Sequence, residues 1–353
     1  MTNTFYWIAA ALLLGVLIMA HELGHFWFAR RLGIRVMSFG IGFGPKLWSH
    51  KARSGITYVL RVLPLGGYCR YYGEDEAVEG DAGPEIVDGA FYRQPVWKRA
   101  LSTFAGPLMN MVVAVLALFT LYAFLGLPTA VLPVIERVEP NTPASEAGLL
   151  PGDEFTSVNG EAVTSSDSVR AVVMDTPSGG SVEIIVERGG VPVTVTVSPR
   201  PLDPQADSPQ IGIRFKQAYT RMGIVDSMKY SVLSAGATVA GMADFLGGLV
   251  TRQQDAGGLV GPFGTIRMVA EQTELGGARE YLQMAALISV NLGFINMLPI
   301  PGLDGSRLLF LLIEKIRRKR MDPNKEGIVH LVGIALLMLL MLPVYIRDIM
   351  GLF

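Results

Sequence analysis

The sequence predicts a polytopic α-helical membrane protein of about four transmembrane helices, with a membrane-associated β-hairpin and an inserted α/β domain. The first observation behind this is composition: half of the 353 residues are hydrophobic and 17% are charged, and the mean hydropathy is +0.39. Ordinary soluble proteins are less apolar and more charged. The second is a set of long apolar segments at both ends of the chain. The third is a valine-rich, strand-like stretch between them.

Four apolar segments are long enough, at the rise of an α-helix, to cross a bilayer. The first has no charged residue from Phe5 to Ala20. The alternative is that this first segment is a cleaved secretory signal peptide. We favour a membrane helix because no Lys or Arg precedes the apolar run and Ile18 is bulky where a signal peptidase requires a small residue. The four helices are expected within residues 1–29, 100–126, 281–314 and 327–347, the third being interrupted by Pro299, Pro301 and Gly302.

Basic residues predict how these helices are oriented. They follow the first helix, precede the second and follow the third, as Arg30, Arg31, Lys98, Arg99, Lys315, Arg317, Arg318, Lys319 and Arg320. The positive-inside rule makes these ends cytoplasmic. We therefore expect both termini, and the segment between the second and third helices, on the opposite side of the membrane.

Residues 30–99 contain two Gly-punctuated strands, Ser38–Trp48 and Thr57–Leu65, and the second leads into Gly66-Gly67-Tyr68. Phe39, Ile41 and Phe43 are unusually apolar for a loop between helices. We expect a hairpin that enters the membrane beside the first helix. A small soluble hairpin packed on the helix ends is the alternative. The acidic, Gly-rich stretch Glu74–Asp88 is expected to be a loop.

Residues 130–202 are typical of a soluble domain. The strands Ser181–Val186 and Val191–Val197 are joined by the hairpin turn Arg188-Gly189-Gly190. A short helix at Pro143–Leu149 and a strand and turn over Gly152–Gly160 precede them. This succession resembles a PDZ domain of the bacterial protease type. Such a domain can bind an extended peptide by strand addition or act as a steric gate, and the sequence leaves both open.

Residues 203–280 show no motif that indicates a chemistry. Helices are expected at Met222–Leu249 and Gly261–Ala270. Asp226, Lys229 and Asp244 disfavour a further membrane crossing, so we expect this part to form amphipathic helices on the outer membrane surface.

The motif His21-Glu22-Leu23-Gly24-His25 ends the first apolar segment. Positions i and i+4 share one face of a helix, so both imidazoles can reach one metal ion with Glu22 beside them. Ionisable groups on a membrane helix are costly and indicate function. The motif is therefore typical of a zinc hydrolase.

Catalytic zinc usually takes three protein ligands. Asp304 is the best third candidate because it is the only acidic residue between Tyr281 and Ile313. A helix-capping role after the Pro-Gly break is the alternative for this aspartate. His330 and His50 are weaker candidates, since they lie among polar or basic residues.

Together these motifs resemble the site-2 protease family, in particular its bacterial regulator of sigma-E protease branch, over essentially the whole chain. Besides His21 to His25 and the PDZ-like domain, the resemblance rests on Gly106-Pro107-x-x-Asn110 and Asn296-x-x-Pro299-x-Pro301-x-Leu303-Asp304-Gly305. It implies that His21, His25 and Asp304 bind one Zn²⁺ and that Glu22 activates water. It further implies that the strands from Phe39 to Tyr68, including Gly67, hold the substrate together with Asn296, Pro299, Pro301 and Asn110. For the two asparagines, hydrogen bonding between helices is the alternative.

Two features depart from the family pattern. The best-known member has two PDZ domains, whereas this chain has room for one. The aspartate motif often continues Gly-His, whereas here it continues Gly305-Ser306-Arg307.

The resemblance implies a multi-pass zinc endoprotease of a bacterial cell (inner) membrane, with an extracytoplasmic PDZ-like domain and an active site near the cytoplasmic side. The expected substrate is the transmembrane segment of a single-span protein, either an anti-sigma factor or a remnant signal peptide. The alternatives are an inactive membrane scaffold that recruits proteins through the PDZ-like domain, and a metal transporter. A net charge of -1 disfavours a nucleic-acid partner. The single cysteine, Cys69, excludes an internal disulfide and a cysteine-based zinc cluster.

Overall fold

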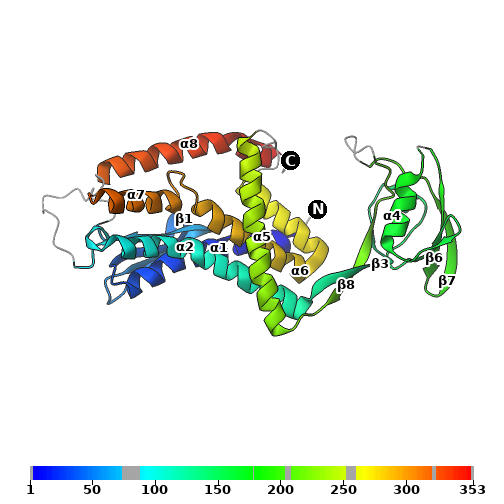
Figure 1. Ribbon diagram of the computed structural model, residues 1–353, viewed down its shortest axis with the longest axis horizontal. Coiled ribbons are helices and arrows are strands. Elements are labelled where there is room, and N and C mark those ends of the chain that lie inside the picture. Colours follow the sequence, from blue (N-terminus) through cyan, green and yellow to red (C-terminus); the bar gives the residue numbers. More distant parts are fainter. Residues whose placement is uncertain are drawn as a thin grey trace. The chain divides into compact units, whose positions relative to one another are not determined.

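The computed structural model describes residues 3–73, 88–177, 179–202, 208–251, 260–319 and 323–350. The chain forms two compact units (Figure 1). Met1–Ala123 and Gly223–Phe353 form the membrane unit, and Phe124–Met222 form the inserted domain. All but Asp88 of the expected acidic loop at 74–88 lies outside the described residues.

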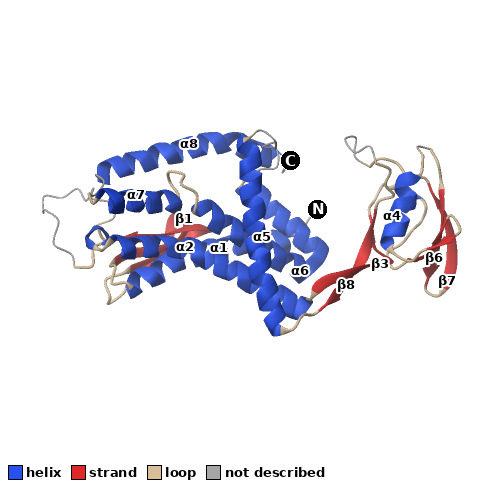
Figure 2. Ribbon diagram, in the orientation of Figure 1, coloured by secondary structure: helices blue, strands red, loops and turns tan. Residues whose placement is uncertain are grey.

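The membrane unit is built mainly of long helices (Figure 2). Asn3 caps the first helix by accepting the N–H of Phe5. The helices are α1 (Thr4–Arg31), the 3₁₀ turn Phe91–Arg93, α2 (Val96–Thr120) with a π turn at Leu121–Leu125, α5 (Ile224–Val250), α6 (Pro262–Asn296), α7 (Asp304–Arg317) and α8 (Pro323–Met350).

Helices α1, α2 and α6 pack closely together in this unit. Their shared apolar core includes Leu13 and Leu17 of α1 with Val269 and Ala270 of α6. At Gly24 of α1, an added Cβ would overlap the carbonyl oxygen of α2 residue Ala105. Small residues allow membrane helices to approach at this distance without a side chain between them.

Three helices of the described chain, α1, α2 and α5, are long and apolar enough to cross a membrane. The bent pair Gly327–Leu336 and Met341–Asp348 of α8 makes a fourth if it is one span. The protein is thus a helical membrane protein with three to four candidate spans.

Helix α5 differs from its sequence-based description as an amphipathic helix. Asp226 and Lys229 lie near its start, so most of its length is apolar and satisfies the length and composition of a span. Figure 1 shows α5 running across the direction of α1 and α2 instead of alongside them. Its position on the outer membrane surface stays a prediction.

The expected third span, 281–314, is divided into two helices. Helix α6 ends at Asn296 and α7 begins at Asp304. Pro299 and Pro301 in the break lack the N–H of a helical hydrogen bond and restrict the residues before them. Gly302 adopts a left-handed φ of 97°. This segment, residues 297–303, is called the break below.

The expected hairpin is present between α1 and α2. Strand β1 (Val36–Lys51) pairs antiparallel with β2 (Thr57–Tyr71). The hairpin packs on the end of α1 through a small core that includes Ala29, Val36 and Tyr71. Leu47 and Trp48 are exposed near its turn, 64% and 54% respectively, and the entry of this hairpin into the membrane stays a prediction.

The inserted domain is a six-stranded sheet with two helices. The strand order is β7-β6-β4-β3-β8, with β5 paired to β4. The core of the domain is formed by alternating residues such as Val182, Ile184 and Val186. The elements are β3 (Leu127–Val138), α3 (Pro143–Glu146), β4 (Glu154–Val158), β5 (Glu161–Ala162), α4 (Ser166–Asp175), β6 (Val182–Arg188), β7 (Val191–Val197) and β8 (Ile213–Thr220).

This domain is longer than the expected 130–202. Strand β8 pairs antiparallel with β3 along most of its length. Its sequence alternates apolar and polar side chains from Ile213 to Phe215, which is the pattern of a half-buried strand. Residues 213–220, expected in the surface region 203–280, therefore belong to the sheet.

An ion pair joins the start of β4 to β6 within this domain. Arg188 donates to both carboxylate oxygens of the buried Asp153, each at 2.7 Å, and the Leu150 N–H donates to Oδ2 at 2.9 Å. The hydrogen bonds from Arg188 hold the pKa of Asp153 below its usual range. The pair fixes the turn that leads into β4.

A second ion pair joins α2 to α7 in the membrane unit. The guanidinium of Arg99 donates to both carboxylate oxygens of Glu314, and its Nε donates to the Gln94 carbonyl at 3.0 Å. The two side chains are only 8% and 13% exposed. The pair holds α7, which carries Asp304, against α2.

We expect Glu314→Gln to lower the free energy of unfolding by about 3 kcal/mol, because it leaves a buried arginine without its countercharge. Thermal unfolding of the purified protein in detergent measures this. The control is Glu271→Gln, which removes an i,i+4 partner of Arg267 with both side chains more than 40% exposed. That change should cost less than about 1 kcal/mol. Equal effects of the two changes would contradict the structural role of the Arg99 pair.

Candidate metal centre and active site

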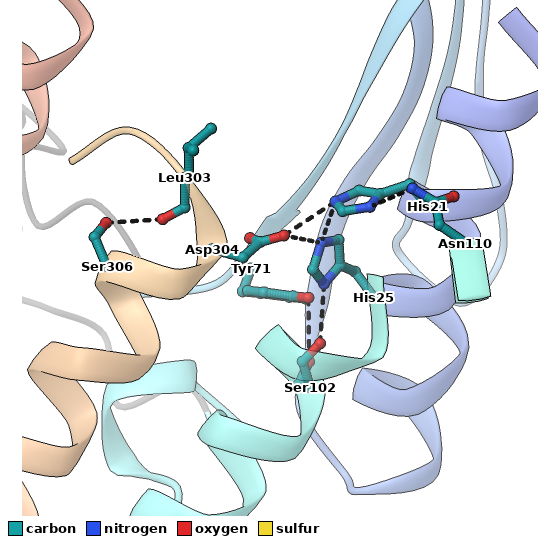
Figure 3. Close-up of polar contacts among 8 residues, drawn as sticks. All are labelled: His21, His25, Tyr71, Ser102, Asn110, Leu303, Asp304 and Ser306. Carbon is teal, nitrogen blue, oxygen red and sulfur yellow. Dashed lines mark hydrogen bonds and ion pairs between the residues drawn. The ribbon is translucent and has the colours of Figure 1, made fainter. Parts of the chain in front are cut away.

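The three side chains that the sequence suggests as metal ligands meet in the membrane unit (Figure 3). Asp304 Oδ2 lies 3.0 Å from His21 Nε2 and 3.3 Å from His25 Nε2. The two Nε2 atoms are 3.1 Å apart. The three possible ligand atoms, one from each residue, all lie within 4.8 Å of one another. Two imidazole nitrogens and a carboxylate oxygen form a donor set that suits a catalytic zinc site with one position left open.

The backbone explains why these residues meet. His21 and His25 lie one turn apart on a buried face of α1. Asp304 is the first residue of α7, directly after the break. At Gly305 an added Cβ would overlap the carbonyl oxygens of Met297 and Leu298, so the chain turns back tightly here. This turn delivers the carboxylate to the histidines of α1.

The second nitrogen of each imidazole contacts α2. His25 Nδ1 lies 2.9 Å from the Ser102 carbonyl oxygen, which can only accept, so Nδ1 carries the proton. The lone pair of His25 is then on Nε2, which faces Asp304. A partner of this kind fixes the tautomer and orientation of a metal-binding histidine.

Asn110 is the corresponding partner of His21. Its Nδ2 lies 3.2 Å from His21 Nδ1, and its Oδ1 is buried with no hydrogen-bond partner in the described part of the chain. The Asn110 amide can therefore rotate by 180° about its Cβ–Cγ bond, which exchanges Oδ1 and Nδ2, without breaking a hydrogen bond of Oδ1. After that rotation the amide oxygen accepts a hydrogen bond from the Nδ1–H of His21, and the lone pair of His21 is on Nε2. The residues present thus fit a metal ion bound by both Nε2 atoms.

Gly106 of α2 makes room for the two imidazoles. A Cβ at this position would overlap the ring of His25 and lie 2.8 Å from His21 Nε2. The backbone of α2 therefore passes directly beside the edges of the rings that would bind metal. A side chain at position 106 cannot be accommodated without moving a histidine.

Glu22 and the metal triad border one cavity of about 420 Å³. Strand β2 forms part of its wall at Gly67 and Tyr68. A Cβ on Gly67 would lie 2.8 Å from Glu22 Cγ, so the strand backbone passes beside this side chain. A carboxylate at such a place can exchange protons with a group in the cavity.

The candidate substrate-binding residues separate into two groups. Gly67, Asn110 and Asn296 line the cavity. Pro299 and Pro301 lie in the break and are not among the residues that line it. Pro301 instead packs against α8, where a Cβ on Gly333 would lie 2.9 Å from the Pro301 carbonyl oxygen.

Several residues at the site were missed by the sequence reasoning. Ser102 acts through its backbone carbonyl, which leaves no signal in the sequence. Tyr71 of β2 also gave no signal in the sequence, although its hydroxyl lies 3.1 Å from Ser102 Oγ. Arg307 and His330, which the sequence analysis named without giving them a role at the site, also line the cavity. The Gly106-Pro107 pair was noticed as a motif, but its steric role follows only from the packing of α2 on α1.

Known proteins are similar to this chain over nearly its whole length. The sequence model described as Peptidase family M50 matches residues 9–340. Zinc metalloprotease RasP of Bacillus licheniformis is 32% identical over 98% of this chain and 99% of that protein. Regulator of sigma-W protease RasP of Bacillus subtilis is also 32% identical, over 98% of both chains.

Among solved structures, the PDZ domain of an SdrC-like protein from Listeria monocytogenes matches 23% of this chain and 84% of that domain. It shows 24% identity and a TM-score of 0.22.

The family model matches residues 9–340, a range that contains positions 21, 22, 25 and 304, and each of the two relatives covers 98% of the chain. The chain therefore belongs to peptidase family M50, the site-2 protease family, and is a metalloendopeptidase.

Proposed function

We propose that this protein is a zinc-dependent intramembrane endoprotease that cleaves a transmembrane segment of single-span membrane proteins. In this proposal His21, His25 and Asp304 hold one Zn²⁺ per chain and Glu22 is the catalytic acid and base. The observation that carries it is the meeting of these four residues at one cavity inside an apolar helical unit. The name of the Bacillus licheniformis relative, a zinc metalloprotease, supports zinc as the metal.

The bound zinc would lower the pKa of a water molecule and polarise the carbonyl of the peptide bond to be cut. Glu22 takes a proton from the attacking water and passes it to the leaving amine. The Ser102 carbonyl and the Asn110 amide hold the two imidazoles in the tautomer that leaves Nε2 free. We accordingly assign Asn110 to orienting His21, and Gly67 and Asn296 to contacting the substrate.

A helical substrate segment must be unwound before it can be cut, because its carbonyls are engaged in helical hydrogen bonds. The backbone of β2 at Gly67 and Tyr68 borders the cavity and can pair with an extended segment by strand addition. The Asn296 amide offers a further polar partner there. Pro299 and Pro301 contribute indirectly, by keeping the break in an irregular conformation.

The proposed location is the inner membrane of a bacterium. Arg30, Arg31 and Lys98 support a cytoplasmic position for the end of α1 and the start of α2, where the metal centre lies, because basic residues favour the cytoplasmic side. The inserted domain, which we regard as PDZ-like, is then extracytoplasmic. It either binds a peptide or restricts access to the membrane unit.

The proposed substrates are anti-sigma factors, cut in regulated intramembrane proteolysis, and remnant signal peptides. The Bacillus subtilis relative is named as a regulator of sigma-W protease, which supports the first class. In both classes another protease would first remove the extracytoplasmic part of the substrate.

Glu22→Gln should reduce cleavage by at least about a hundredfold, because the loss of a general acid and base usually costs 10²–10⁴ in rate. Cleavage of a single-span model substrate by purified protein in liposomes measures this. Zinc content should be unchanged, and Glu271→Gln serves as the control. Undiminished cleavage by Glu22→Gln would overturn the mechanism. If the wild type also failed to cleave any single-span protein, the scaffold alternative would be favoured.

Elemental analysis should find one zinc per purified chain. A strong chelator should remove both the zinc and the cleavage activity, and added Zn²⁺ should restore them, since the open site exchanges its metal with solution. His21→Ala, His25→Ala and Asp304→Ala should each lose the metal. Retention of zinc in all three variants would place the metal elsewhere in the chain.

Gly106→Ala should weaken zinc binding by at least about tenfold, because the new methyl group displaces a histidine and changes around metal ligands commonly cost 10–100-fold in affinity. The control is Gly241→Ala in α5, where an added Cβ meets no atom within 4 Å. Chelator competition on both purified variants compares them. Equal zinc affinity of the two would show that α2 does not pack against the rings as described.

A further inference from the structure

His330 of α8 contacts the break that carries Asp304. Its Nδ1 accepts a hydrogen bond of 3.0 Å from the N–H of Gly302, two residues before the carboxylate ligand. It also lines the cavity of the metal centre together with Ile334 of the same helix. The side chain thus links a separate helix to the backbone that positions Asp304.

The break and α8 touch on both sides of this hydrogen bond. A Cβ added to Gly302 would lie 2.7 Å from Ile334 Cγ1, and one added to Gly333 would lie 2.9 Å from the Pro301 carbonyl oxygen. His330, Gly333 and Ile334 follow at i, i+3 and i+4, which places them on one face of α8. This face supports the break directly.

The other backbone hydrogen bonds of the break are local. Ile300 N–H donates to Leu298 at 2.8 Å, and Leu303 N–H donates to Ile300 at 3.1 Å. Ser306 Oγ then donates to the Leu303 carbonyl at 2.7 Å. Gly302, with its left-handed φ of 97°, is different because its N–H is bound by a side chain from another helix. The hydrogen bond from Gly302 to His330 therefore fixes the orientation of the peptide that leads into Leu303 and Asp304.

We propose that His330 is a positioning residue of the metal centre, which holds the Gly302 peptide so that the Asp304 carboxylate reaches both imidazoles. The inference rests on the proposed role of Asp304 as a zinc ligand. His330 itself is not a ligand here. Among the described residues the group that can hold a metal is His21, His25 and Asp304, and the Nδ1 of His330 accepts the N–H of Gly302. Groups that orient a ligand commonly contribute 10–100-fold to metal affinity.

The test compares three substitutions in the full-length protein. His330→Asn places an amide oxygen near the position of Nδ1 and keeps an acceptor. His330→Leu has a similar size and no acceptor. His330→Phe also has no acceptor but keeps a ring against Phe310, whose centroid is 5.6 Å from that of His330. This third variant covers the case in which His330→Leu does not fold.

Zinc affinity, measured by competition with a chromophoric chelator, should fall about tenfold in His330→Leu and His330→Phe. The zinc affinity of His330→Asn should stay within about twofold of the wild type, because the asparagine oxygen can still accept the hydrogen bond from Gly302. Cleavage by the two weakened variants should return to nearly the wild-type kcat when zinc is in excess. A role in packing alone would not be corrected by added metal.

Two outcomes would overturn the inference. One is a wild-type zinc affinity in all three variants. The other is an equal loss in all three, because the acceptor retained by His330→Asn would then be irrelevant. A wild-type protein that binds no zinc would instead contradict the proposed function, so the two failures can be told apart.

Discussion

The close approach of α2 to α1 is the constraint on which the rest of the site depends. Gly24 lets the Ala105 carbonyl reach α1, and Gly106 lets the backbone of α2 pass beside both imidazoles. Only at this distance can the Ser102 carbonyl and the Asn110 amide hold the outer nitrogens of His25 and His21. The packing of α2 on α1 therefore sets the tautomers of the two histidines.

The third ligand is supplied by an interruption of a helix. A continuous helix through 281–314 would satisfy its backbone in lipid but could not turn back toward α1. The prolines and Gly302 end α6, and the backbone N–H groups of the break donate to nearby carbonyls or to His330 of α8. Irregular backbone at membrane depth is tolerated where protein covers it or where it borders a cavity. The break meets both conditions, because α8 covers it and it borders the cavity. Asp304 follows directly after it.

The ligand candidates were accessible to sequence reasoning because charged and imidazole groups are rare in apolar segments, so His21, His25 and Asp304 stand out. The hairpin and the strands of the inserted domain followed equally well from alternation and turn residues. Strand β8 was missed because its alternation is short and its partner β3 is distant in the chain, so that the pairing itself leaves no local pattern. Arg99 stood out in the sequence as one of the basic residues that flank the second apolar segment, but its bond to Glu314 depends on how α7 packs. The span count was harder still, since α5 is apolar enough to cross while its direction differs from that of α1.

Zinc X-ray absorption spectroscopy on the purified wild-type protein tests the central claim most directly. A zinc ion held by His21, His25 and Asp304 would have a first shell of nitrogen and oxygen atoms at about 2.0–2.2 Å, with the multiple scattering of two imidazoles and no sulfur. Cys69 lines the same cavity and is the one residue there that could supply a thiolate. A sulfur shell at about 2.3 Å, or a shell without imidazole, would contradict the assignment of His21, His25 and Asp304 as the metal centre.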